Sequence, residues 1–240
     1  MTEFINTQWP LIGIALSAGL ILLAQQWRST LIGLLFNYIF VAAFLAQPQF
    51  GSADIDVIGI SIRTTILVKL IAGLSAVLIL AVTALTFSRD YNADALDEFS
   101  LAELRRAARL AQRKQLVAPL RFADFVVPMW ALILAAIASF ILPRLYPIGS
   151  EVDVFAWYWL TLTGIFTIVT ANDLLKLGLG LLVCVSSIDL LYTAIASTVE
   201  VFPLAMLGLT TIVLSLSVSY LSGLMYGRLK TLELNELYKR

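Results

Sequence analysis

LLKLGLGLLVCVSSIDLLYTAIAS occupies residues 174–197 and is long and apolar enough to cross a membrane as one helix. A bilayer core is roughly 30 Å thick, and about 20 apolar residues in a helix span it. Hydrophobic residues make up 60% of the chain and charged residues 13%, a composition unlike that of a soluble domain. The sequence therefore predicts an all-α, polytopic transmembrane helix bundle. We expect seven spans, at residues 10–26, 30–47, 62–87, 124–143, 153–171, 174–197 and 201–226.

The basic residues predict the orientation of the bundle. If the spans alternate in direction, nearly all lysines and arginines fall on the side that carries 88–123 and the C-terminal tail. The opposite side then has only Arg63 and Arg144. Because an excess of Lys and Arg marks the cytoplasmic face, we expect the N-terminus outside, the C-terminus in the cytoplasm, and a place in the inner (cytoplasmic) membrane. The first residues lack the basic region of a cleaved signal peptide.

The polar segment divides the chain into three parts. We expect residues 1–87 to form a first three-helix transmembrane unit, 88–123 a cytoplasmic loop, and 124–240 a four-helix transmembrane unit with a cytoplasmic tail. Both membrane units contain a hairpin with a polar turn followed by a cation and glycine: Arg28 and Gly33 in the first, and Lys176 with Gly178 and Gly180 in the second. This pattern suggests a duplication of three-helix units, of the kind common in transport proteins.

The segment 88–123 carries its own helix signals. Ser100 and Glu103 have the spacing of a capping box, and Pro119 ends the segment. Between them, arginines recur at helical spacing: Arg105, Arg106, Arg109 and Arg113. Such a helix is expected either to lie on anionic lipid headgroups or to dock a partner subunit.

Four ionisable residues of the spans are candidates for an ion pathway. A charge in the bilayer interior costs roughly 2.5–3.5 kcal/mol on insertion scales, so such a residue is a functional candidate by default. Asp189 and Lys69 lie well inside their spans, and Asp173 and Lys176 lie at the cytoplasmic boundary of the sixth span. For Asp189, one interpretation is a structural carboxylate bonded to hydroxyls or paired with Lys69. The other is an element of a proton relay.

Composition also predicts what the chain lacks. It has no histidine, and its one cysteine, Cys184, lies inside a span, so we expect no catalytic residues, no metal site and no cofactor. The net charge is zero, and no nucleic-acid partner is expected.

Several short runs resemble one family of membrane subunits. They are WRSTLIG at 27–33, WLTLTGIFTIVTANDLLK at 159–176 with LGLGLLVCVSSIDLLY at 177–192, and TLELNEL at 231–237, together with the lysine at 69. These runs resemble the E component of hydrogenase-4 and formate-hydrogenlyase membrane complexes. The C-terminal half of that family is in turn similar to the K-type subunit of complex I and the C subunit of multisubunit Na⁺/H⁺ antiporters.

The resemblance implies a non-catalytic membrane subunit that contributes to the proton or sodium path of a larger complex, or scaffolds it. Its partners would be other membrane subunits, antiporter-like ones among them. The family carries a membrane glutamate where this chain has no acid, at 182–185, and Asp189 lies one helical turn further along. Two alternatives stand beside this interpretation. One is a small stand-alone membrane transporter, and the other is a membrane anchor for a cytoplasmic partner that docks on 88–123.

Overall fold

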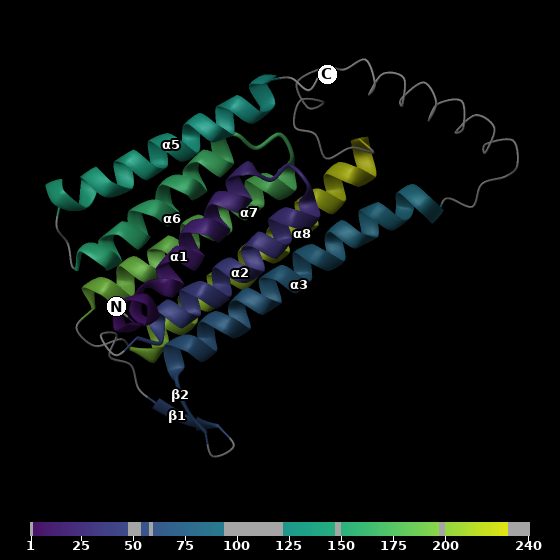
Figure 1. The fold of residues 1–240 in the computed structure, drawn as a ribbon. Coiled ribbons are helices and arrows are strands. Elements are labelled where there is room, and N and C mark those ends of the chain that lie inside the picture. The colour runs from purple at the N-terminus through teal and green to yellow at the C-terminus, as the bar shows by residue number, and fades with distance from the viewer. Residues whose placement is uncertain are drawn as a thin grey trace, which may run out of the picture.

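The computed structural model describes residues 2–47, 54–57, 60–93, 122–146, 150–196 and 200–229. Its helices are α1 (Thr2–Leu23), α2 (Trp27–Leu45), α3 (Thr64–Ala93), α5 (Phe122–Leu145), α6 (Glu151–Val169), α7 (Leu174–Ile195) and α8 (Val201–Leu229) (Figure 1). Among these residues, six helices are long and apolar enough to cross a membrane, and the apolar part of α1, Gln8–Leu23, is shorter. The predicted all-α transmembrane bundle is confirmed.

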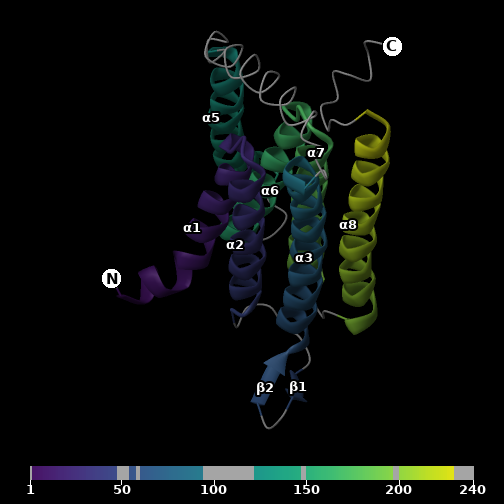
Figure 2. The same ribbon diagram turned by 90° about the vertical axis from the view of Figure 1, so that its right-hand side faces the viewer.

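A short hairpin between α2 and α3 was not expected from the sequence. Strand β1 (Asp54–Val57) pairs antiparallel with β2 (Ile60–Arg63) at one end of the bundle (Figure 2). Both strands alternate apolar and polar residues, which is the period of a strand, and α3 consequently begins only at Thr64. Arg63 donates hydrogen bonds to the carbonyl oxygens of Ala46 (3.0 Å) and Gln47 (2.5 Å), so the hairpin is tied to the C-terminal end of α2.

The helices form two rows of three, with α5 beside the second row. Helices α1, α2 and α3 follow one another in the first row, and α6, α7 and α8 follow one another in the second. Each helix of one row packs on its counterpart in the other: α1 on α6, α2 on α7 and α3 on α8. Helix α5 lies along α6 (Figure 1).

Glycines allow the closest helix contacts within each row. A Cβ atom at Gly33 of α2 would lie 3.0 Å from Ile21 Cγ1 and 3.5 Å from the Ser17 carbonyl oxygen of α1. A Cβ atom at Gly180 of α7 would lie 2.7 Å from Ile168 Cγ1 and 2.9 Å from a backbone oxygen of α6. Small residues let helix backbones approach in lipid, where association depends on close packing. In both the α1–α2 and the α6–α7 hairpin, a glycine of the second helix thus packs against an isoleucine of the first.

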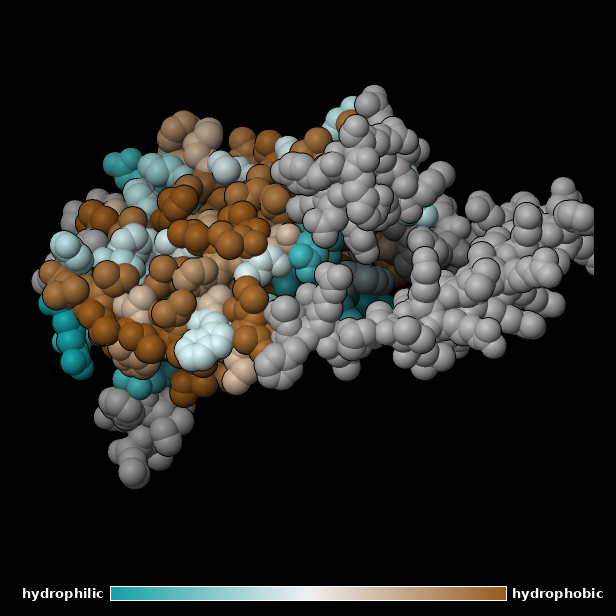
Figure 3. Space-filling model, turned by 90° about the horizontal axis from the view of Figure 1, so that it is seen from above, coloured by the Kyte–Doolittle hydropathy of each residue, from teal (hydrophilic) through white to brown (hydrophobic). Residues whose placement is uncertain are grey.

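The surface of the bundle is suited to lipid. Large apolar side chains are exposed along α5 and α8, for example Trp130 at 62% and Phe202 at 70%. Hydrophobic residues cover most of the described surface on the face seen in Figure 3. Exposed apolar area of this extent is typical of a membrane protein, because in water it would cause aggregation. The chain is a multi-pass integral membrane protein.

Candidate functional site

The two charged residues predicted deep inside the spans meet in the structure. Lys69 projects from α3 and Asp189 from α7, and each is only 3% exposed. The Lys69 ammonium forms an ion pair with Asp189 Oδ2 and also donates a hydrogen bond to Ser186 Oγ, at 3.3 Å. Ser186 and Asp189 are three residues apart on α7, so one face of that helix supplies both acceptors.

Tyr38 of α2 completes the site from a third helix. The Lys69 ammonium lies 5.2 Å from the centre of the Tyr38 ring, within the range of a cation–π contact. A Cβ atom at Gly73 of α3 would overlap the Tyr38 ring, so the absence of a side chain at Gly73 lets the ring lie against α3. The Tyr38 hydroxyl lies beside Ser186 and Thr211, the latter on α8. Four helices, α2, α3, α7 and α8, therefore enclose the ion pair.

One oxygen of this site, Asp189 Oδ1, is buried without a hydrogen-bond partner among the described residues. A buried oxygen left without a partner costs free energy, and most native polar groups avoid it. A carboxylate oxygen that accepts no hydrogen bond from the protein is able to accept a proton or coordinate a cation, and Asp189 Oδ1 lies on the carboxylate that pairs with the Lys69 ammonium.

The ion pair lies nearer to one end of the bundle than to the midplane. Lys69 is five residues from Thr64, and Asp189 is six from Ile195, which places both residues about 8–9 Å from the helix ends beside the hairpin. If the predicted orientation holds, this is the outer end.

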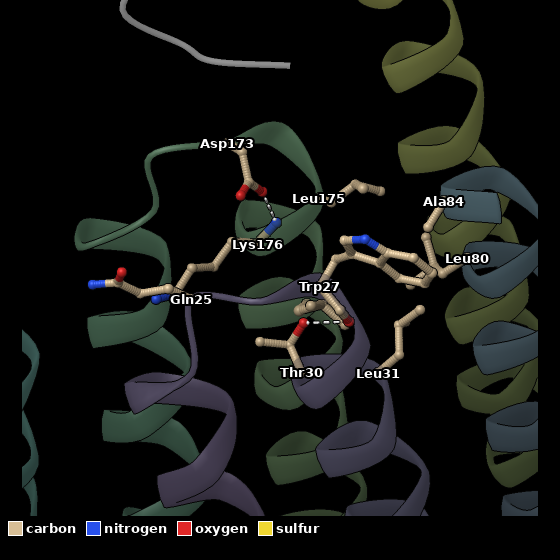
Figure 4. A pocket seen from close by; sticks show the side chains of 10 residues that line it. Gln25, Trp27, Thr30, Leu31, Leu80, Ala84, Asp173, Leu175 and Lys176 are labelled. Atoms are coloured by element: carbon tan, nitrogen blue, oxygen red, sulfur yellow. Dashed lines mark hydrogen bonds between the residues drawn. The ribbon is translucent and has the colours of Figure 1, made fainter. Parts of the chain in front are cut away.

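The other two predicted residues lie at the opposite end of α7. Asp173 is the N-cap of α7, and its carboxylate accepts a hydrogen bond from the Lys176 backbone N–H at 2.5 Å. The Lys176 ammonium donates to the Leu22 carbonyl oxygen of α1, at 3.2 Å. Both residues line a small pocket, with a cavity volume of about 10 Å³, which also includes Gln25 of the α1–α2 turn and Trp27 at the start of α2 (Figure 4).

The four candidate residues therefore form two separate places rather than one site. Lys176 and Asp189 are 13 residues apart on α7, or about 20 Å along the helix. Between them, the buried face of α7 is made of glycines and the apolar side chains Leu179, Leu182 and Val183 as far as Val183, and buried serines begin only next to the ion pair, at Ser186 and Ser187. The predicted docking residues Arg105, Arg106, Arg109 and Arg113 lie outside the described residues, as do Ser100, Glu103 and Pro119.

Sequence reasoning missed Tyr38 and its neighbour Asn37. Asn37 is fully buried in α2 and donates from Nδ2 to Ser17 Oγ of α1, at 3.2 Å. An amide followed by a tyrosine in the middle of an otherwise apolar span was the available signal. The described residues contain no cluster of three His, Cys, Asp or Glu residues that could hold a metal ion.

Comparison with protein-family models, with curated proteins and with solved structures finds no match to this chain.

Proposed function

We propose that the chain is a non-catalytic integral membrane subunit of an ion-translocating complex, and that Lys69 and Asp189 hold a proton or sodium ion on its way across. The kind of complex, whether complex-I-like, hydrogenase-like or antiporter-like, rests on the sequence resemblance. A place in the inner membrane rests on the distribution of basic residues.

The observation that carries this proposal is the free oxygen of Asp189. A buried ion pair that serves only to stabilise a fold is expected to have its remaining lone pairs satisfied by other donors, because desolvation of both charges is costly. In this site, Oδ2 contacts Lys69, whereas Oδ1 has no partner in the described part of the chain. Ionisable residues kept at such a cost inside a membrane commonly mark ion pathways.

The chemistry at the pair is simple. A proton that binds Asp189 neutralises the carboxylate and weakens its attraction for the Lys69 ammonium, which is then free to move or to lose a proton. A sodium ion would instead use the oxygen atoms of Asp189, Ser186 and Tyr38, since hard cations take oxygen ligands. Either event couples occupancy of the site to the packing of α3 against α7.

Transport measured in sealed vesicles tests this proposal. The Asp189→Asn variant keeps the shape of the side chain but has no exchangeable charge, so an assembled complex should lose ion translocation. Asp153→Asn is the matched control, because Asp153 lies in the first turn of α6 and is not part of the buried site. Normal translocation by an assembled Asp189→Asn complex would remove the pair from the ion path and leave a scaffold role.

A stand-alone transporter is the second candidate, and the two-row arrangement favours it. Gly33 and Gly180 make matching contacts in the two rows, as expected if two related three-helix units face one another. The purified chain, reconstituted by itself into liposomes, distinguishes the two candidates. Ion flux through the chain alone supports the transporter, whereas flux only after co-purified subunits are added supports the subunit. The third alternative, an anchor for a partner on 88–123, concerns a segment of which the structure describes only 88–93, at the end of α3, and 122–123, at the start of α5.

A further inference from the structure

A second cavity opens on the lipid-facing side of the bundle, far from the ion pair. Its volume is about 430 Å³, and it lies between α1, α5 and α6. The wall is mainly aliphatic and aromatic, and two of its side chains, Leu16 (70% exposed) and Phe140 (63% exposed), face outward. A cavity of this size is in the range of small-ligand sites, and its opening faces the hydrocarbon.

One wall of this cavity carries an unsatisfied hydroxyl. Ser139 of α5 lines the cavity and is completely buried, and its Oγ has no hydrogen-bond partner within the described ranges. Ser17 of α1, by contrast, bonds to the carbonyl of Ile14 in the preceding turn, at 3.1 Å. A hydroxyl without a partner beside an open apolar cavity indicates a ligand that combines an apolar body with a hydrogen-bond acceptor.

Two opposite charges stand at the mouth of the same cavity. Arg144 of α5 and Glu151 of α6 both line it, both are exposed, and no described salt bridge joins them. Arg144 is five residues beyond Ser139, about 8 Å toward the end of α5. A guanidinium group favours phosphate and a carboxylate favours a primary ammonium, so the pair complements a headgroup that has both charges.

We propose that this cavity binds an aminophospholipid of the phosphatidylethanolamine type. The phosphate contacts Arg144, the ammonium contacts Glu151, and the Ser139 hydroxyl donates to an ester carbonyl of the glycerol backbone. One acyl chain follows the apolar wall between Leu16 and Phe140. A quinone fits less well, because it carries no charge to meet Arg144 or Glu151.

Headgroup selectivity follows from these contacts. Phosphatidylglycerol has no cation for Glu151 and adds a net negative charge beside it. Phosphatidylcholine has a quaternary ammonium that cannot donate a hydrogen bond to the carboxylate. The site is independent of the ion pair and does not rest on the proposed transport function.

Native mass spectrometry of the full chain, delipidated in detergent and titrated with the three phospholipids of identical acyl chains, tests the proposal. We expect phosphatidylethanolamine to bind about tenfold more tightly than phosphatidylglycerol, the size of effect typical of one hydrogen bond to a charged group. Glu151→Gln should remove that difference, and Arg144→Gln should weaken the binding of all three. Both residues are exposed, so neither change is expected to prevent folding.

A cavity-filling variant provides the second arm. Ser139→Leu should abolish lipid retention, whereas Thr210→Leu, which adds a similar side chain on the exposed face of α8, should leave it unchanged. Equal affinity for the three phospholipids, or a preference for phosphatidylethanolamine that survives Glu151→Gln, would overturn the proposal. So would a quinone analogue that Ser139→Leu excludes while phosphatidylethanolamine remains bound. If Ser139→Leu fails to fold, the phospholipid affinities of Glu151→Gln and Arg144→Gln test the proposal without it.

Discussion

Removing one member of the buried ion pair should destabilise the bundle much more than removing both. Lys69→Met leaves the Asp189 carboxylate in a site that is only 3% exposed, with its donor Lys69 gone. Breaking a buried pair from one side costs about 3–5 kcal/mol, and insertion scales give roughly 2.5–3.5 kcal/mol for one uncompensated charge in the membrane. We therefore expect a loss of about 3 kcal/mol in the free energy of unfolding. Asp189→Asn, which leaves the lysine unpaired, should cost a similar amount.

The double variant Lys69→Met/Asp189→Asn separates this interaction from other effects. With both charges gone, the penalty of an unpaired charge disappears, so the double variant should lie within about 1 kcal/mol of the wild type. The free energy of unfolding of each purified variant, measured in mixed micelles with increasing SDS, gives the coupling energy of the cycle. Two single variants that each lose less than about 1 kcal/mol, or a double variant that loses the sum of both, would refute the argument.

Three further outcomes are expected. Gly180→Ala should lower the free energy of unfolding by about 1–3 kcal/mol, because its Cβ would crowd the Ile168 side chain and the backbone of α6. Gly223→Ala is the control: no atom lies within 4 Å of its Cβ, so it should be neutral or slightly stabilising in the same unfolding assay. Asp173→Ala should cost about 1 kcal/mol through loss of the N-cap of α7, and Asp173→Ser should recover most of it; equal stability of all three forms would contradict the capping role. In a Cys184→Ser background, Asp54→Cys and Ala107→Cys should react with an impermeant maleimide from opposite faces of the membrane. Labelling of both from one face would contradict the seven-span orientation.

The sequence predicts the spans well because the signal is strong and local. An apolar run of about 20 residues has few alternatives to a transmembrane helix, and each of the seven predicted spans overlaps a helix of the structure, six of which are long and apolar enough to cross a membrane among the described residues. The hairpin at 54–63 was missed because two four-residue strands with alternating polarity are a weak signal beside a long apolar helix.

The pairing of Lys69 with Asp189 was one of two interpretations open from the sequence, and the structure supplies the contact. The enclosing residues were not predictable in the same way. Tyr38 reaches the pair only because α2 packs against both α3 and α7 and because Gly73 leaves room for its ring, and such packing depends on residues far apart in the chain. Asp173 and Lys176, which the sequence places at the boundary of the span, lie at the other end of α7, with Lys176 about 20 Å from Asp189 along the helix.

Ion transport by the double variant Lys69→Met/Asp189→Asn tests the central claim most directly. The variant lacks both charges yet is expected to be nearly as stable as the wild type, so a loss of transport cannot be attributed to misfolding. In sealed vesicles that contain the protein with its co-purifying subunits, we predict normal assembly, shown by unchanged subunit ratios, and no ion gradient. A gradient that forms at the wild-type rate in the assembled double variant would contradict the account.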